Sequence, residues 1–132
     1  MSPETFELRQ IGVVRSALEQ LDDAPKQGFE GGADAWLELD PALVDGLDGV
    51  SEGSHVIVLT WLHRADRDVL RVHPRDDVRN PLRGVFSTRS ASRPNPIGLH
   101  EVEVLEVDGA RLRVRPLEAV DGTPVVDLKP VL

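Results

Sequence analysis

Prolines and glycines separate a series of short apolar runs in this sequence, and this pattern most constrains its fold. The 132 residues include ten prolines and eleven glycines, which interrupt helices and favour turns. The densest apolar run, residues 55–62 (HVIVLTWL), is rich in β-branched residues and predicts a buried strand. Residues 102–107 and Arg111–Arg115 flank an Asp-Gly turn and predict a hairpin. We therefore expect a mainly β fold, a small single-domain β-barrel.

Shorter segments extend this prediction along the chain. Further strands are expected at residues 6–16, Ala35–Leu39, 69–73, 83–88 and 125–128. Asp40 is a plausible N-cap for a helical turn that begins at Pro41, and residues 21–32 are expected to form a loop. In the second hairpin arm, Leu112 and Val114 alternate with arginines, so we expect one buried and one wet face.

Length and composition limit the class of protein. The length suits one domain spanning residues 1–132. The absence of cysteine excludes disulfides, thiolate metal sites and cysteine nucleophiles, and it favours a reducing compartment. No apolar run approaches the roughly 18 residues of a membrane span, and the first ten residues lack a signal-peptide pattern. We expect a cytoplasmic protein with no membrane contact.

The formal charge of −8 is unevenly distributed. Residues 64–93 hold eight arginines against four aspartates, a local charge of +4, so the remainder carries −12. Pro74 and Pro81 argue against one continuous helix in this window. Two interpretations remain open, a solvated and salt-bridged loop or a surface that faces phosphate or carboxylate groups. The net acidity argues against a protein that grips a long nucleic acid.

Several common chemistries are not indicated by any motif. The sequence lacks GxGxxG and GxxxxGK[ST], which argues against a dinucleotide fold and a P-loop. It also lacks the GxSxG nucleophile elbow. The four histidines have neither HxxxH nor HxH spacing, so no metal site is predicted. One of them, His55, enters the predicted buried strand and is interpreted as a structural residue.

Two stretches have unusual sequences for strands or helices. Residues 84–99 (GVFSTRSASRPNPIGL) contain two prolines that stiffen the backbone around Arg93 and Asn95. Residues 121–130 (DGTPVVDLKP) begin with an Asp-Gly turn and place Asp127 and Lys129 on the same side of an extended chain. A stiff loop with arginines and an amide suits an anionic or polar ligand, because little ordering entropy is lost on binding. Rigid turns that close a small barrel are the alternative.

Taken together, these two stretches resemble the signature of the TsaA-like, or TrmO, family. The resemblance rests on residues 83–99 and 121–130, and also on IGVVRS at residues 11–16 and Ser54-His55. It implies a compact β-barrel that is unlike the Rossmann methyltransferases. It also implies an enzyme that uses S-adenosylmethionine to methylate the N6 nitrogen of threonylcarbamoyladenosine in tRNA. Members of the family are homodimers that hold the cofactor in loops near the subunit contact.

The resemblance assigns cofactor binding to residues in four segments. These are Pro25, Lys26, Gln27, His63, Arg64, Arg89, Leu99, Glu118, Ala119, Val120 and Asp121. The cofactor carboxylate needs a cation, which Arg89 or Lys26 could supply. Its ribose hydroxyls and amino group need acceptors, which Glu118 or Asp121 could supply. The adenine ring is expected between two apolar side chains, those of Leu99 and Val120.

Asp127 and Lys129 are the predicted catalytic pair. A urea-like N6 nitrogen is a poor nucleophile, so proton removal or polarisation of the neighbouring carbonyl would assist methyl transfer. Asp127 would accept the proton and Lys129 would donate to the carbonyl. The alternative is a structural ion pair at the dimer contact.

The sequence departs from the family pattern near its end. Val131 stands where the family usually has tyrosine, and the chain has no tyrosine on which a base could stack. Longer relatives continue into a second, smaller domain, so we expect a short form that lacks it. Two alternatives to the tRNA reaction therefore stay open. One is the same methyl transfer to a small metabolite, and the other is a non-catalytic module that binds S-adenosylmethionine.

Overall fold

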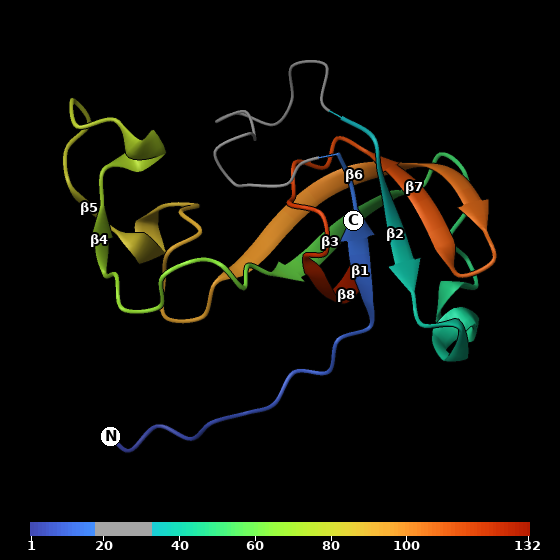
Figure 1. Ribbon diagram of the computed structural model, residues 1–132, viewed down its shortest axis with the longest axis horizontal. Coiled ribbons are helices and arrows are strands. Elements are labelled where there is room, and N and C mark those ends of the chain that lie inside the picture. The colour runs from blue at the N-terminus through green and yellow to red at the C-terminus, as the bar shows by residue number, and fades with distance from the viewer. Residues whose placement is uncertain (18–32) are drawn as a thin grey trace.

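Six antiparallel strands form a closed barrel in the computed structural model, which describes residues 1–17 and 33–132 (Figure 1). The order around the barrel is β1-β2-β7-β6-β3-β8. The strands are β1 Gly12–Arg15, β2 Ala35–Leu39, β3 His55–Trp61, β6 Ile97–Asp108, β7 Arg111–Arg115 and β8 Pro124–Pro130. The predicted mainly β barrel is therefore confirmed.

The core fills the inside of this barrel with aliphatic side chains from alternating strand positions. In β7, Leu112 and Val114 are fully buried while the flanking arginines reach toward solvent, as the alternation predicted. In β3, Val58 and the hydroxyl-bearing Thr60 are also fully buried. The side-chain period of two residues along a strand places one apolar set inside and leaves the other set on the outer surface.

The hairpin of β6 and β7 forms as predicted, with Gly109 at the turn in a left-handed conformation (φ 59°). However, β6 begins at Ile97, five residues earlier than the predicted strand. The last residues of the stretch 84–99, expected to be a rigid loop, therefore belong to a strand. They pair with β3, where Ile97 is opposite Trp61 and Leu99 is opposite Leu59. The strand can start there because the two prolines precede it.

The first strand is much shorter than predicted. Residues 6–11 were expected to be part of it, but β1 begins only at Gly12. Its partner β2 ends at Leu39, opposite Gly12. The chain then turns at Asp40, whose side chain accepts a hydrogen bond from the Ala42 N–H and caps the 3-10 helix η2 (Pro41–Leu47), as predicted. The Asp40 N–H still donates to the Ile11 carbonyl (2.8 Å), but residues 6–10 have no continuing β2 edge to pair with.

The arginine-rich window folds into a lobe outside the barrel, with two very short strands, β4 Arg71–Val72 and β5 Arg83–Gly84 (Figure 1). Two 3-10 helices, η3 Pro74–Asp76 and η4 Val85–Ser87, complete it. Half of the strand predicted at residues 83–88 is thus helical, and the one predicted at residues 69–73 is reduced to two residues. The physical reason is the small apolar core of the lobe: Val85 is its one fully buried side chain among residues 63–95.

No helix in residues 1–17 and 33–132 is long and apolar enough to cross a membrane.

Candidate functional site

The segment from Glu118 to Asp121 is hydrogen-bonded to both ends of the chain that flank residues 18–32. Before that gap, the Ser16 N–H donates to Asp121 Oδ1 (3.0 Å) and the Ser16 hydroxyl donates to the Ala119 carbonyl (2.6 Å). After it, the Ala33 N–H donates to Glu118 Oε1 (3.1 Å). Four predicted site residues, 118 to 121, are therefore held at the base of the predicted cofactor loop.

The loop residues Pro25, Lys26 and Gln27 themselves lie outside the described residues. What the structure fixes is where their segment leaves and rejoins the barrel. Ser16 and Ala33 are 17 residues apart in sequence, yet both are hydrogen-bonded to one short segment of the chain.

Glu118 and Asp121 keep part of their capacity to accept hydrogen bonds. A carboxylate offers about four lone-pair positions on its two oxygens. Glu118 Oε2 receives no hydrogen bond from a described residue. Asp121 Oδ2 lies 3.9 Å from a guanidinium nitrogen of Arg15, at the limit of an ion pair. Both carboxylates therefore keep acceptor positions that no hydrogen bond from the described residues occupies.

Ala119 and Val120 contribute their backbone to this segment, because both side chains are buried. The Val120 carbonyl accepts hydrogen bonds from the Thr123 N–H (3.1 Å) and hydroxyl (2.6 Å), which closes the Asp-Gly turn. Val120 is 3% exposed, whereas Leu99 on the outer face of β6 is 47% exposed. The structure therefore offers a ring the Leu99 side chain but not that of Val120, unlike the expected pair.

A second group of predicted site residues, His63 and Arg64, lies at the end of β3 and is exposed. The following turn is tied to the Arg-Pro-Asn-Pro stretch by backbone hydrogen bonds. The Leu62 N–H donates to the Pro96 carbonyl (2.8 Å), and the Arg93 N–H donates to the Asp66 carbonyl (2.9 Å). The end of β3 and the central motif are thus one structural unit.

The two arginines of the central motif have different roles. Arg93 points into the lobe, where its guanidinium donates to the carbonyls of Val85 and Thr88. Arg89 is exposed and forms no hydrogen bond or ion pair with any residue of the described segments. Arg93 therefore holds the loop, while Arg89 is available to a ligand. The sequence does not separate these roles, because both residues occupy similar Ser/Thr-rich surroundings.

Asp127 and Lys129 do lie together, as their spacing predicted. Their side chains form an ion pair of 3.6 Å on the outer surface of β8. They face outward opposite Leu59 and Ile57 of β3, respectively. The geometry is compatible with the predicted catalytic pair and with a structural ion pair, so the role remains a prediction.

His100, rather than His55, is the more buried of these two histidines. His55 is exposed at the start of β3, while the His100 ring lies against the fully buried Thr60, with 3.0 Å between Nε2 and the hydroxyl. Burial lowers the pKa of His100 from 6.5 to about 4, so the ring is neutral at pH 7. The alternation of side chains along a strand could have indicated this, since residues 100, 102 and 104 share one side of β6 and Val102 and Val104 are apolar.

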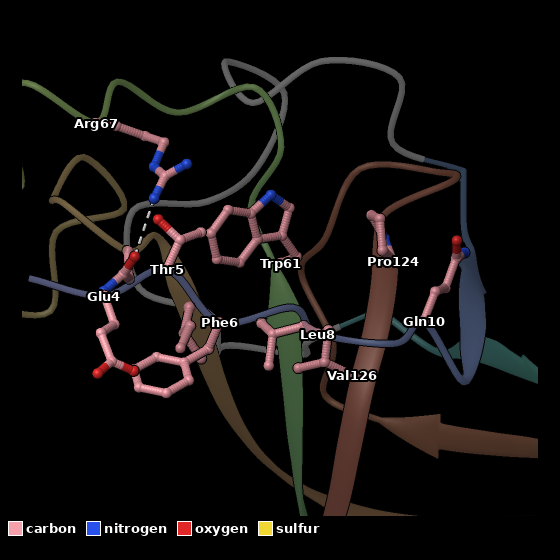
Figure 2. Close-up of a pocket in the computed structure, with 11 residues that line it drawn as sticks. Glu4, Thr5, Phe6, Leu8, Gln10, Trp61, Arg67, Pro124 and Val126 are labelled. Atoms are coloured by element: carbon pink, nitrogen blue, oxygen red, sulfur yellow. Dashed lines mark hydrogen bonds between the residues drawn. The ribbon is translucent and has the colours of Figure 1, made fainter.

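A cavity that no sequence pattern predicted lies on the outside of the barrel. It has a volume of about 580 Å³ and lies between the N-terminal segment and the outer faces of β3, β6 and β8 (Figure 2). Phe6, Trp61 and Arg67 are among its lining side chains. Within residues 1–17 and 33–132, no three His, Asp or Glu side chains are grouped as metal ligands would be.

Comparison with known proteins gives consistent matches. The family described as tRNA-methyltransferase O N-terminal domain matches residues 13–132. A probable S-adenosyl-L-methionine-binding protein of Methanothermobacter thermautotrophicus is 48% identical over 130 residues, which cover 98% of this chain and 93% of that protein. An S-adenosyl-L-methionine-binding protein of Archaeoglobus fulgidus is 48% identical over 122 residues, 92% of this chain and 86% of the relative.

Solved structures agree with this match. The crystal structure of TrmO from Pseudomonas aeruginosa superposes with a TM-score of 0.78 at 32% sequence identity. The similarity covers 98% of this chain and 57% of the TrmO chain, so the present chain spans little more than half of that protein's length.

Proposed function

Because the chain belongs to the family of the tRNA-methyltransferase O N-terminal domain, we propose that it is a methyltransferase that uses S-adenosylmethionine. The observation that carries this proposal is the convergence of both ends of the predicted cofactor loop on the Glu118–Asp121 segment. When bound, the cofactor supplies a methyl group on a positively charged sulfur. The protein's part is to bind and align, which can lower a barrier by about 7–11 kcal/mol.

The residues present fit such a cofactor. A ligand with an amino group, ribose hydroxyls and a carboxylate needs several acceptors and a cation. Glu118 and Asp121 retain acceptor positions, and the Arg89 guanidinium is exposed without a partner among the described residues. Leu99 adds exposed apolar surface on β6. The cofactor-binding set named from the sequence is retained as a proposal on these grounds.

A homodimer is part of the proposal. Among the described contacts, Arg89 forms no hydrogen bond or ion pair with the Glu118–Asp121 segment. Within one chain, therefore, no described contact connects the proposed cation of the cofactor site to its proposed acceptors. A second copy could bring Arg89 of one subunit to Glu118 of the other. The experiment is co-expression of Arg89→Ala and Glu118→Ala subunits carrying different tags. Activity that reappears only in the mixed dimer supports a shared site, whereas an inactive mixed dimer contradicts it.

The proposed acceptor is the N6 nitrogen of threonylcarbamoyladenosine in tRNA, in the cytoplasm. The arginine-rich lobe supports an anionic acceptor, because four of its guanidinium groups have no partner among the described residues. These belong to Arg71, Arg75, Arg83 and Arg89. The lobe also carries Phe86, which is 81% exposed and could stack on an unpaired base. Sequence-independent phosphate contacts of this kind make binding strongly dependent on salt.

A methyl-label transfer assay tests the function and its alternatives. Label in bulk tRNA supports the tRNA acceptor, and label only in a small-molecule cell extract favours a metabolite. Cofactor binding with no transfer to either favours a non-catalytic binding protein, an alternative supported by the names of the curated relatives. Absence of tRNA affinity even at low salt would remove the tRNA acceptor.

Arg89→Ala tests the cofactor site directly. Loss of a charge-assisted hydrogen bond is expected to weaken cofactor affinity about 10- to 100-fold. Arg75→Ala, another exposed arginine of the lobe that is not in the proposed cofactor set, is the matched control. Equal cofactor affinity of Arg89→Ala and the parent protein would contradict the assignment.

The Asp127 and Lys129 pair is proposed to act on the acceptor. Both side chains are more than half exposed, so as an ion pair they contribute at most about 1 kcal/mol to stability. Asp127→Asn is therefore expected to leave the unfolding midpoint almost unchanged and to lower kcat while cofactor affinity stays constant. Unchanged kcat would leave them a structural ion pair only.

A further inference from the structure

The N-terminal segment and the barrel enclose the cavity of about 580 Å³ described above, and none of the assigned cofactor residues that the structure describes lines it. Its size falls within the range of about 300–1,000 Å³ typical of small-molecule sites. Residues 4–10 form one wall, and the outer faces of β3, β6 and β8 form the other (Figure 2). The segment is fastened at its end, where the Ile11 N–H donates to the Val125 carbonyl (2.8 Å).

Among residues 1–17 and 33–132, two aromatic side chains line this cavity, although aromatic residues make up 4% of the chain. Trp61 comes from the end of β3 and Phe6 comes from the N-terminal segment. The Arg67 guanidinium lies over the Trp61 ring, 5.2 Å from its centroid. In the view of Figure 2, Arg67 and Phe6 both lie to the left of Trp61, Arg67 above it and Phe6 below it. Phe6 is 81% exposed and Leu8 is 56% exposed, so this wall retains apolar surface that a flat ligand would cover.

Two side-chain amides supply polar positions in the same cavity. Asn95 Oδ1 accepts a hydrogen bond from Arg67 (3.0 Å), which leaves its Nδ2 as a donor with no partner in the described chain. Gln10 Nε2 donates to the Gly12 carbonyl (3.0 Å), which leaves its Oε1 as an acceptor. Purine rings carry both acceptor nitrogens and exocyclic groups, so they match a donor and an acceptor placed around an aromatic surface.

The charges around the cavity favour a neutral ring over an anion. Arg67 stacks on Trp61 and also donates to the Pro94 carbonyl (2.7 Å) and to Asn95. Two of its five N–H donors are therefore engaged within the protein, and its face packs on the indole ring. Glu4 places a carboxylate at the rim of the same cavity. An anionic ligand would meet one partly engaged cation, Arg67, and one opposing charge, Glu4.

We propose that this cavity binds the adenine ring of a nucleoside, with the ring stacked on Trp61 and enclosed by Phe6. The inference rests on the proposed function only for its choice of adenine. Adenine is present both in S-adenosylmethionine and in an adenosine acceptor, and the experiment below separates the two sources. Aromatic stacking suits this task because every base has a π-face. The side-chain amides of Asn95 and Gln10 would distinguish adenine from other bases by hydrogen bonding.

The protein contains a natural control for this proposal. Its other tryptophan, Trp36 on β2, also has an arginine over its ring, since Arg111 lies 4.2 Å from the centroid. Trp36 does not line the cavity. Trp36→Phe therefore leaves Trp61 as the single fluorescent reporter, and Trp61→Phe leaves Trp36. Adenosine, S-adenosylmethionine and ribose are titrated into both single-tryptophan proteins, up to about 10 mM for weak ligands.

Quenching of Trp61 but not of Trp36 by adenosine or S-adenosylmethionine, with no effect of ribose, is the expected result. Quenching by S-adenosylmethionine alone assigns the ring to the cofactor, and quenching by adenosine in the presence of saturating cofactor assigns it to the acceptor. Trp61→Leu is expected to weaken the same ligand about 5- to 100-fold in calorimetry, the range found when one stacked aromatic ring is removed, and Phe6→Ser is expected to weaken it less. Circular dichroism of each variant reports whether the barrel is intact.

Three results would overturn the inference. The first is no change of Trp61 fluorescence with either adenine compound. The second is equal quenching of both tryptophans. The third is a Trp61 signal that changes with protein concentration alone, which would mean that a second copy of the chain covers the cavity. Failure of methyl transfer with intact Trp61 quenching would contradict the proposed function and leave this binding site standing.

Discussion

Replacement of His100 by glutamine is expected to flatten the decline of the protein's stability in mild acid. His100 lies inside the barrel wall beside the fully buried Thr60, and burial lowers its pKa from 6.5 to about 4. Glu101, the next residue of β6, is exposed and points to the other side of the strand. The imidazole is therefore neutral in the folded protein over a range in which an unfolded chain would protonate it.

The sign follows from proton binding in the two states. As the pH falls below 6.5, the unfolded chain binds a proton at this residue and the folded protein does not, so the free energy of unfolding decreases. The decrease stops near pH 4, where the folded protein also binds the proton. The two pKa values give a loss of about 2 kcal/mol at pH 5 and about 3 kcal/mol at pH 4, relative to neutral pH.

Urea unfolding followed by circular dichroism, at about pH 7, 6 and 5, measures this loss. Glutamine can still bond to the Thr60 hydroxyl but does not titrate. The parent protein should therefore lose about 2 kcal/mol more than His100→Gln between pH 7 and pH 5. His55→Gln is the control, because His55 is exposed at the start of β3 and should leave the slope unchanged. Equal slopes for His100→Gln and the parent protein would refute the reasoning.

Three further substitutions probe other parts of the fold. Gly98→Ala would place a methyl group against the Thr60 hydroxyl and is expected to lower the free energy of unfolding by about 1–3 kcal/mol in urea. Arg93→Ala removes the donors to two carbonyls of the lobe, so hydrogen exchange of the amides in η4 should accelerate at least tenfold while exchange in the barrel stays constant. Asp40→Ala removes the cap of η2 and should cost about 1 kcal/mol in thermal unfolding, whereas Asp40→Asn should cost less.

Local patterns in the sequence were sufficient for much of the barrel. The period of two residues in β7 identified its buried and exposed faces, and the Asp-Gly turn identified the hairpin. The cap at Asp40 followed from one side chain and one neighbouring N–H. The two long motifs also indicated the family, which the comparisons confirm. Such features depend on residues close together in sequence, where steric limits and hydrogen-bond geometry leave few alternatives.

The candidate site depended on contacts that the sequence does not contain. Ser16 and Asp121 are 105 residues apart, and only closure of the barrel brings β1 beside β8 so that they can bond. The separate roles of Arg89 and Arg93 follow from which guanidinium finds unpaired carbonyls when the lobe folds.

The sequence by itself determined most strands of the barrel, the hairpin turn and the family, because these follow from alternation, backbone restriction and local order. The tertiary structure decided which side chains meet. It made His100 more buried than His55, and it brought Phe6 and Trp61 to one cavity, because residues 6–10 lie beyond the end of β2. Burial and proximity are properties of the closed barrel as a whole, and no short segment of the chain specifies them.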